Sequence, residues 1–174
     1  VWVLAGLGSL LAAFPPVFSA LLSSLYVPVM LVIVAILFRA IGVELRPKTD
    51  SALLQGIFDF MIPFGSAVTA WAIGLVAGNV LVGMPLDQAG NLSGSWLFFL
   101  HPFALVTSLV SLVALTLHGT LYVAMKTDGS QSEALAEAGK RLLLILAGLA
   151  LVAAVYGALI LGPRFAASKA LLGF

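Results

Sequence analysis

Long apolar runs alternate with short polar segments along the whole chain. A helix needs about 20 apolar residues to cross a bilayer, at about 1.5 Å of rise each. The runs that reach this length are Val17–Phe38, Phe60–Gly83, Trp96–Met125 and Leu142–Gly162. Val1–Phe14 is shorter and ends at two consecutive prolines, which favour a helix end. The pattern predicts an all-α, polytopic transmembrane helix bundle with four full spanning helices plus one truncated helix.

Composition supports lipid as the solvent of these helices. The sequence has 174 residues, of which 62% are hydrophobic and 9% charged, and its mean hydropathy is +1.19. A soluble domain has about 25% charged residues. A net charge of +1 argues against a nucleic-acid partner, and the absence of cysteine excludes disulfides and thiolate metal sites. Because the chain starts in mid-run at Val1, we expect residues 1–174 to form a single transmembrane helical domain of a larger subunit.

The charges in the connections predict an orientation. Leu45–Asp59 and Lys126–Arg141 carry lysine and arginine, whereas Met84–Ser95 carries neither. Positive residues in short loops mark the cytoplasmic side, so the two basic connections are expected inside and Met84–Ser95 outside. Arg164 and Lys169 then fall on the outer side, which fits the rule less well.

Two backbone features are expected within the spanning helices. Pro28 lies inside Val17–Phe38 and predicts a kink that neighbouring helices can accommodate. Gly74 and Gly78 lie four residues apart, a small-residue pattern that lets membrane helices approach closely. We interpret these glycines as packing positions without chemistry.

The two histidines are the first candidates for chemistry. His101 precedes Pro102 at an expected helix start, where interfacial solvation explains it. His118 lies deep in an apolar run, where an ionisable group suggests function, but Thr116, Thr120 and Tyr122 are possible hydrogen-bond partners. Without cysteines or an HExxH pattern, two isolated histidines predict no metal site.

A group of charged residues follows the apolar run Val17–Phe38, in the stretch FRAIGVELRPK. Glu44 can be a surface carboxylate that pairs with Arg46, or a group that handles protons inside the protein. Arg39 lies about 7.5 Å further into the membrane if the helix continues, and its long side chain can reach back to the interface. Asp59, at the expected start of the next helix, can simply compensate the helix dipole.

An ordered series of motifs resembles subunit II of cytochrome bd-type quinol oxidases. That family has a Trp-Asp-Gly-Asn-Glu motif directly before a Val-Trp pair, a proline turn, and an Arg-x-x-Gly-x-Asp/Glu-x-Arg-x-Lys signature. The present chain begins after the first motif. The HPFALV and HGTLYVAMKT stretches are similar to the cyanide-insensitive branch. The matching residues in the first part of the chain are Val1, Trp2, Pro15, Arg39, Gly42, Glu44, Arg46 and Lys48.

This resemblance implies a haem-free subunit of a membrane quinol:oxygen oxidoreductase in a bacterial or archaeal plasma membrane. Haem b and haem d are then expected in the partner, subunit I, and none in this chain. A structural quinone or lipid and a small accessory subunit are further expected partners. Glu44 and Arg39 match positions associated with a cytoplasmic proton path, with Asp59 and Arg46 as supporting residues. His118 gains no such role.

The alternative is a subunit of a small-molecule transporter or exporter. Such proteins also combine apolar helices with interrupted segments and charged shoulders. The sequence contains no evident inverted repeat and no matching pair of broken helices. A structural membrane scaffold is a third interpretation, close to the oxidase reading because that subunit carries no haem.

Overall fold

Helices account for nearly all of the regular structure in the described part of the chain. The computed structural model describes residues 2–87, 92–93 and 95–172. Val1 and part of the Met84–Ser95 connection therefore lie outside the described residues. The elements are α1 (Trp2–Ala13), α2 (Pro15–Ser24), α3 (Tyr26–Leu45), the 3₁₀ turn η1 (Arg46–Lys48), α4 (Ala52–Val82), the 3₁₀ turn η2 (Trp96–Leu100), α5 (Pro102–Ala124) and α6 (Ser130–Leu172).

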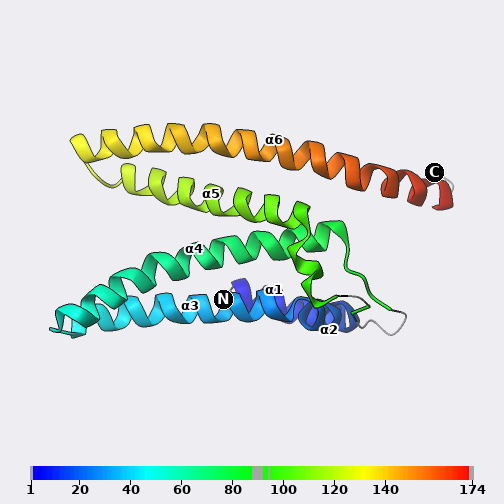
Figure 1. The fold of residues 1–174 in the computed structure, drawn as a ribbon, viewed down its shortest axis with the longest axis horizontal. Coiled ribbons are helices and arrows are strands. Elements are labelled where there is room, and N and C mark those ends of the chain that lie inside the picture. The colour runs from blue at the N-terminus through cyan, green and yellow to red at the C-terminus, as the bar shows by residue number, and fades with distance from the viewer. Residues whose placement is uncertain (1, 88–91, 94, 173–174) are drawn as a thin grey trace.

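Four of these helices are long and apolar enough to cross a membrane, which confirms the predicted fold class. The candidate spans are Tyr26–Lys48, Ala52–Val82, Pro102–Ala124 and Ser130–Ile160. They form an antiparallel row in the order α3, α4, α5, α6, and each packs chiefly on its neighbours in sequence (Figure 1). The α3–α4 and α5–α6 turns lie at one end of the row, as the predicted parity of crossings requires.

The apolar pattern predicts one helix over Val17–Phe38, but the structure divides this run between two helices. Helix α2 ends at Ser24, Leu25 leaves helical geometry at φ −99° and ψ 27°, and α3 begins at Tyr26. A helical proline lacks an N–H donor and its ring clashes with the carbonyl four residues earlier. For Pro28 that residue is Ser24, so the chain breaks one turn before the proline. Pro28 itself lies in the first turn of α3 and does not kink its interior.

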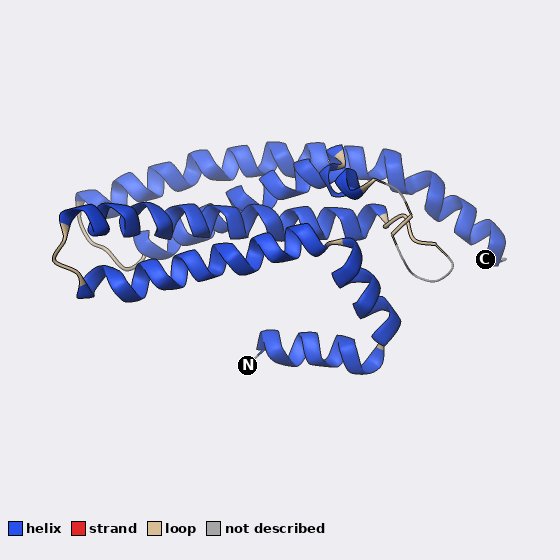
Figure 2. Cartoon of the chain, turned by 60° about the horizontal axis from the view of Figure 1, so that its bottom comes forward, coloured by secondary structure: helices blue, strands red, loops and turns tan. Residues whose placement is uncertain are grey.

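The N-terminal helices turn away from the row. Pro15 and Pro16 begin α2, with Phe14 as its non-helical N-cap. Helix α1, the predicted truncated helix, packs chiefly on α2 and lies apart from the spanning helices in Figure 2. The two short helices therefore extend the molecule sideways at the end of the row opposite the α3–α4 turn.

The connections in the structure are shorter than those predicted from the positions of the charged residues. Helix α4 already begins at Ala52, and α6 already begins at Ser130. The start of α6 contains close i,i+3 and i,i+4 pairs from Glu137 to Lys140 and Arg141. Such pairs stabilise a polar helical segment. A search for hydrophobic runs does not detect a segment of this kind. Pro102 begins α5, so the start of the run Trp96–Met125 is the separate turn η2.

Glycines on α4 set how closely the row packs. A β-carbon at Gly78 would lie 2.0 Å from Thr107 Oγ1, and one at Gly74 would lie 2.6 Å from Ser108 Cα. On the other side, a β-carbon at Gly65 would lie 2.5 Å from Ala35 O. Small residues of this kind allow backbones to touch where lipid provides no hydrophobic drive between helices. The packing interpretation of Gly74 and Gly78 agrees with these contacts.

Hydroxyl and amide groups connect the same helices. Thr107 Oγ1 donates to Gly74 O at 3.0 Å, and Ser111 Oγ donates to Ala70 O at 2.8 Å. The side chain of Asn79 is buried and donates to Leu75 O on its own helix and to Phe99 O in η2. Asn79 therefore connects the end of α4 to the turn that leads into α5.

The arrangement of the turns predicts their accessibility. Single cysteines placed at Ser51 and Ser130 should react with a membrane-impermeant thiol reagent from the same face, and a cysteine at Ser93 from the opposite face. The native sequence contains no cysteine, so labelling has no background from this chain. The positive-inside rule further predicts that Ser51 and Ser130 are cytoplasmic. Labelling of these two positions from opposite faces would contradict the row.

The close approach at Gly78 predicts a strong response to a single methyl group. Gly78→Ala should destabilise the protein by about 1–3 kcal/mol, as overpacking commonly does. Gly56→Ala is the matched control on the same helix, because a β-carbon there meets no atom within 4 Å. It should be neutral or stabilising by about 0.5–1 kcal/mol. Thermal unfolding in detergent measures both, and equal effects would contradict tight α4–α5 packing.

Candidate functional site

The charged end of α3 and the start of α4 bring the predicted site residues into one region. Helix α3 continues to Leu45, so Arg39 and Glu44 both lie on it as expected. Glycine allows α4 to approach here: a β-carbon at Gly42 would lie 2.8 Å from Ile62 Cγ1 and 3.3 Å from Phe58 O. This contact sets the register of the two helices at their charged ends.

Arg46 and Asp59 form the ion pair that joins the two helices. The Nε and Nη2 groups of Arg46 donate to the two carboxylate oxygens of Asp59, with Nη2 to Oδ2 at 3.2 Å. The two side chains are about half exposed, at 49% and 51%. Two-point contact fixes the planar groups of both partners and makes the pair directional.

This pair corrects the interpretation of Asp59. Helix α4 begins at Ala52, so Asp59 lies two turns inside the helix and does not cap its N-terminus. The dipole effect falls off within the first turn. Asp59 therefore interacts with the neighbouring helix end through Arg46.

Glu44 has a different partner from the one expected. Lys48 Nζ donates to Glu44 Oε1, four residues apart, and Arg46 is already paired with Asp59. The Glu44 side chain is 69% exposed. Residues four apart lie on the same helix face, so the spacing Glu44 to Lys48 was a signal that sequence analysis could have used.

Arg39 does not join these two pairs. It lies five residues before Glu44, which is about 140° around the helix, so the two side chains leave α3 on different faces. Its side chain is exposed, and it makes no hydrogen bond or ion pair with any residue that the structure describes. The structure thus places the four predicted residues in one region but brings only Arg46 and Asp59 into contact.

The histidines lie at opposite ends of α5. His101 is the N-cap, and its Nδ1 accepts a hydrogen bond from Phe103 N at 3.2 Å, which agrees with the predicted helix start. His118 is exposed. Thr116 and Thr120, the suggested partners of His118, instead donate to the backbone carbonyls of Leu112 and Thr116.

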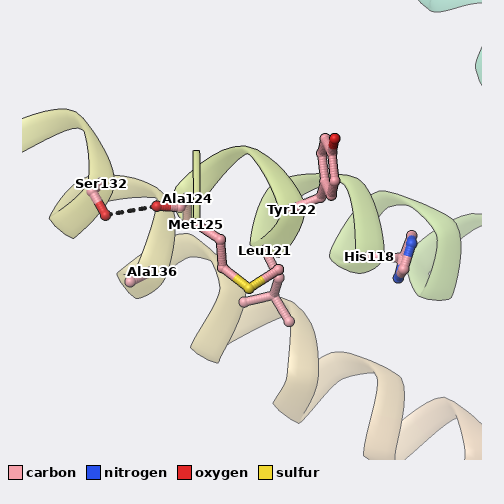
Figure 3. A pocket seen from close by; sticks show the side chains of 7 residues that line it. All are labelled: His118, Leu121, Tyr122, Ala124, Met125, Ser132 and Ala136. Atoms are coloured by element: carbon pink, nitrogen blue, oxygen red, sulfur yellow. Dashed lines mark hydrogen bonds between the residues drawn. The ribbon is translucent and has the colours of Figure 1, made fainter. Parts of the chain in front are cut away.

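His118 lines a pocket of about 490 Å³ between the end of α5 and the start of α6 (Figure 3). Ser132 closes one side by donating to Ala124 O at 2.9 Å. The pocket belongs to the α5–α6 pair and not to the charged α3–α4 end. Its lining is mostly apolar and consists of His118, Leu121, Tyr122, Ala124, Met125, Ser132 and Ala136.

The two imidazoles are poorly arranged to hold one haem or metal between them. They are 17 residues apart on one helix, which separates them by about 25 Å along its axis. Among the described residues, no three His, Cys, Asp or Glu side chains lie close enough to hold a metal ion. The charged α3–α4 end is therefore the better candidate site, and its groups suit proton exchange and ion pairing.

Comparison with known proteins gives a consistent result over the whole chain. The sequence model of the family "Cytochrome bd terminal oxidase subunit II" matches residues 1–174. The chain is 32% identical over 164 residues to cytochrome bd-I ubiquinol oxidase subunit 2 of Escherichia coli K12, covering 90% of this chain and 43% of that protein. It is 35% identical over 132 residues to the probable cytochrome oxidase subunit 2 of Haemophilus influenzae, covering 73% of this chain.

A more distant relative extends the similarity to another bacterial group. Cytochrome bd ubiquinol oxidase subunit 2 of Bacillus subtilis is 26% identical over 129 residues, covering 74% of this chain and 38% of that protein. The chain thus spans less than half the length of the curated relatives that it matches. With its four long apolar helices it is a multi-pass membrane protein. Because the family match covers every residue, the chain belongs to the cytochrome bd terminal oxidase subunit II family.

Proposed function

We propose that this chain is part of a haem-free subunit of a membrane quinol:oxygen oxidoreductase. The observation that carries the proposal is the family match over residues 1–174. The relatives named as ubiquinol oxidase subunits support a quinol as the electron donor of the complete enzyme. The same match favours an oxidase over the transporter alternative. The partner is the haem-bearing subunit I, with haem b and haem d in that subunit.

The second part of the proposal is that the charged α3–α4 end supplies protons from the cytoplasm. Reduction of one O₂ to two H₂O consumes four electrons and four protons, so the enzyme needs a proton source. Glu44 is a suitable entry group because its carboxylate is exposed and contacts Lys48.

Arg46 and Asp59 have a supporting role in this proposal. Their two-point pair holds the end of α3 against α4 and so positions the turn that carries Lys48. Arg39 adds a permanent positive charge deeper on α3, about 7.5 Å from Glu44 along the helix axis. These roles follow from charge and position and do not require a direct contact between Arg39 and Glu44.

The distance between the histidines is unfavourable for one haem held by both. His101 is the N-cap of α5, and His118 lies about 25 Å away along that helix. The pocket beside His118 is mostly apolar and suits a lipid or quinone tail better than a charged ligand. A bound haem would supply electron transfer and oxygen chemistry, and in this proposal it does so outside this chain.

Removal of the titratable carboxylate at Glu44 should slow the enzyme. Glu44→Gln in the intact complex keeps side-chain size and should leave haem content normal. Quinol oxidase turnover should fall about ten-fold or more, since proton-transfer groups commonly contribute about 10²–10⁴. Glu44→Asp should retain much of the turnover because it still ionises. Turnover per haem is the measurement.

Asp50→Asn is the matched control, because Asp50 is an exposed carboxylate in the adjacent turn. It should leave turnover unchanged. Wild-type turnover in Glu44→Gln would show that Glu44 is only a surface charge and does not supply protons. Equal losses in Glu44→Gln and Asp50→Asn would indicate a general surface-charge effect instead.

The histidines should be dispensable for haem binding. His118→Ala and His101→Ala in the intact complex should each retain the wild-type haem content, measured by absorption spectra against protein concentration. Loss of one haem per complex from His118→Ala alone would show that this chain supplies an axial ligand, and would overturn the haem-free assignment.

A further inference from the structure

His101 joins the turn η2 to the start of α5, and its imidazole caps this helix. Its backbone N–H donates to Phe98 O at 3.1 Å, and its Nδ1 accepts from Phe103 N–H at 3.2 Å. Its carbonyl accepts from Leu105 N–H at 3.0 Å. Because η2 ends and α5 begins at this one residue, three hydrogen bonds of His101 define the η2–α5 junction (residues 98–105).

The imidazole satisfies a donor that the helix backbone leaves unpaired. Pro102 has no N–H, and the N–H of Leu105 already donates to His101 O. The N–H of Phe103, in the first turn, therefore needs an acceptor outside the helix backbone. Phe103 is only 4% exposed, and its ring lies against Tyr156 on α6. Water has little access to this N–H, and an unsatisfied buried donor is costly.

A proton on Nδ1 removes this cap. An imidazole nitrogen accepts a hydrogen bond only while it carries no proton, and an imidazolium donates from both nitrogens. The start of α5 also carries the positive end of the helix dipole, which repels a cation. His101 is half-buried, so protons can reach it, and histidine changes charge between about pH 5 and 8. Protonation thus leaves Phe103 N–H without its acceptor.

No ion pair compensates a charge on His101 among the described residues. The titratable groups on the neighbouring elements at this end of the row are Tyr26, Asp87 and Tyr156. No hydrogen bond or ion pair joins His101 to any of these three groups. Arg164 and Lys169 lie further along α6, and their side chains are outside the described residues.

The junction also contacts other parts of the fold. The side chain of Asn79, near the end of α4, donates to Phe99 O in η2 at 2.8 Å. The buried side chain of Phe99 belongs to the same apolar cluster as Leu25 at the α2–α3 break and Leu75 on α4. The cap at His101 therefore supports the contacts that η2 makes with α4 and with the α2–α3 break.

We propose that His101 is a proton-sensitive cap, whose neutral form holds the η2–α5 junction closed and whose protonated form releases it. His101 lies at the end of α5 opposite the α5–α6 turn, so the positive-inside rule places it on the outer side. The junction then responds to the pH of the outer side and not to that of the cytoplasm. The proposal rests on the hydrogen bonds of His101 and does not depend on the proposed oxidase function.

Hydrogen–deuterium exchange in the intact complex tests the cap directly. The protection factor is the ratio of the intrinsic to the measured exchange rate, and it is compared at about pH 8 and about pH 5 for the amides of residues 103–105. Protection should be about ten-fold lower at the acidic pH, since a lost N-cap and a cation at a helix N-terminus together cost about this factor.

Two substitutions separate the cap from its protonation. His101→Asn keeps a good N-cap that gains no proton, so protection should stay high at both pH values. His101→Ala removes the acceptor and should show low protection at both. His118→Asn is the matched control, because it removes the other histidine of α5, which is exposed and far from the junction. It should keep the wild-type response to pH.

Equal protection of the wild-type protein at the two pH values would overturn the proposal. A pH response that persists in His101→Asn, or that disappears in His118→Asn, would assign the effect to another group. Low protection of His101→Asn at both pH values would show that position 101 does not act through an N-cap. None of these measurements uses quinol oxidase turnover, so failure of the oxidase assignment remains distinguishable from failure of the cap.

Discussion

The close approach of α4 to both of its neighbours is the constraint on which the row depends. Gly65 lies against α3, whereas Gly74 and Gly78 lie against α5. Nine residues separate Gly65 from Gly74, which is two and a half helical turns, so these glycines lie on opposite sides of α4. A helix with close contacts on opposite sides places its two neighbours in a line with it. The order α3, α4, α5 in Figure 1 therefore follows from glycine spacing on α4.

The same contact determines which charges can meet. Gly42 faces α4, and Arg46 lies four residues later on the same face, so only Arg46 reaches Asp59. Glu44 lies two residues after Gly42, about 200° around α3, and faces away from α4. Its pairing with Lys48 on its own chain segment follows from that direction. The α3–α4 contact thus leaves Arg46 in an ion pair between helices and Glu44 as an exposed carboxylate.

The fold class could be predicted from the apolar runs, but element ends could not. The break at Leu25 depends on the carbonyl that Pro28 excludes one turn earlier, which a hydropathy pattern does not contain. The start of α6 is polar and was assigned to a connection, because helical charge pairs interrupt the apolar period. At the site, Glu44 and Lys48 could be paired from their spacing alone. The pairing of Arg46 with Asp59 required the register of α3 against α4, which only the structure supplies.

Helix α3 lies at one edge of the row, and this position limits where a proton can go from Glu44. A proton that enters at Glu44 must continue to another acceptor, and Glu44 points away from α4. Arg39, about 140° around the same helix, lies beside α4 and makes no ion pair among the residues that the structure describes. The side chains of Glu44 and Arg39 therefore leave α3 on different sides. If Glu44 delivers protons, the next acceptor belongs to a helix outside the row. Helix α4 fixes the position of α3 through Gly42 and Gly65.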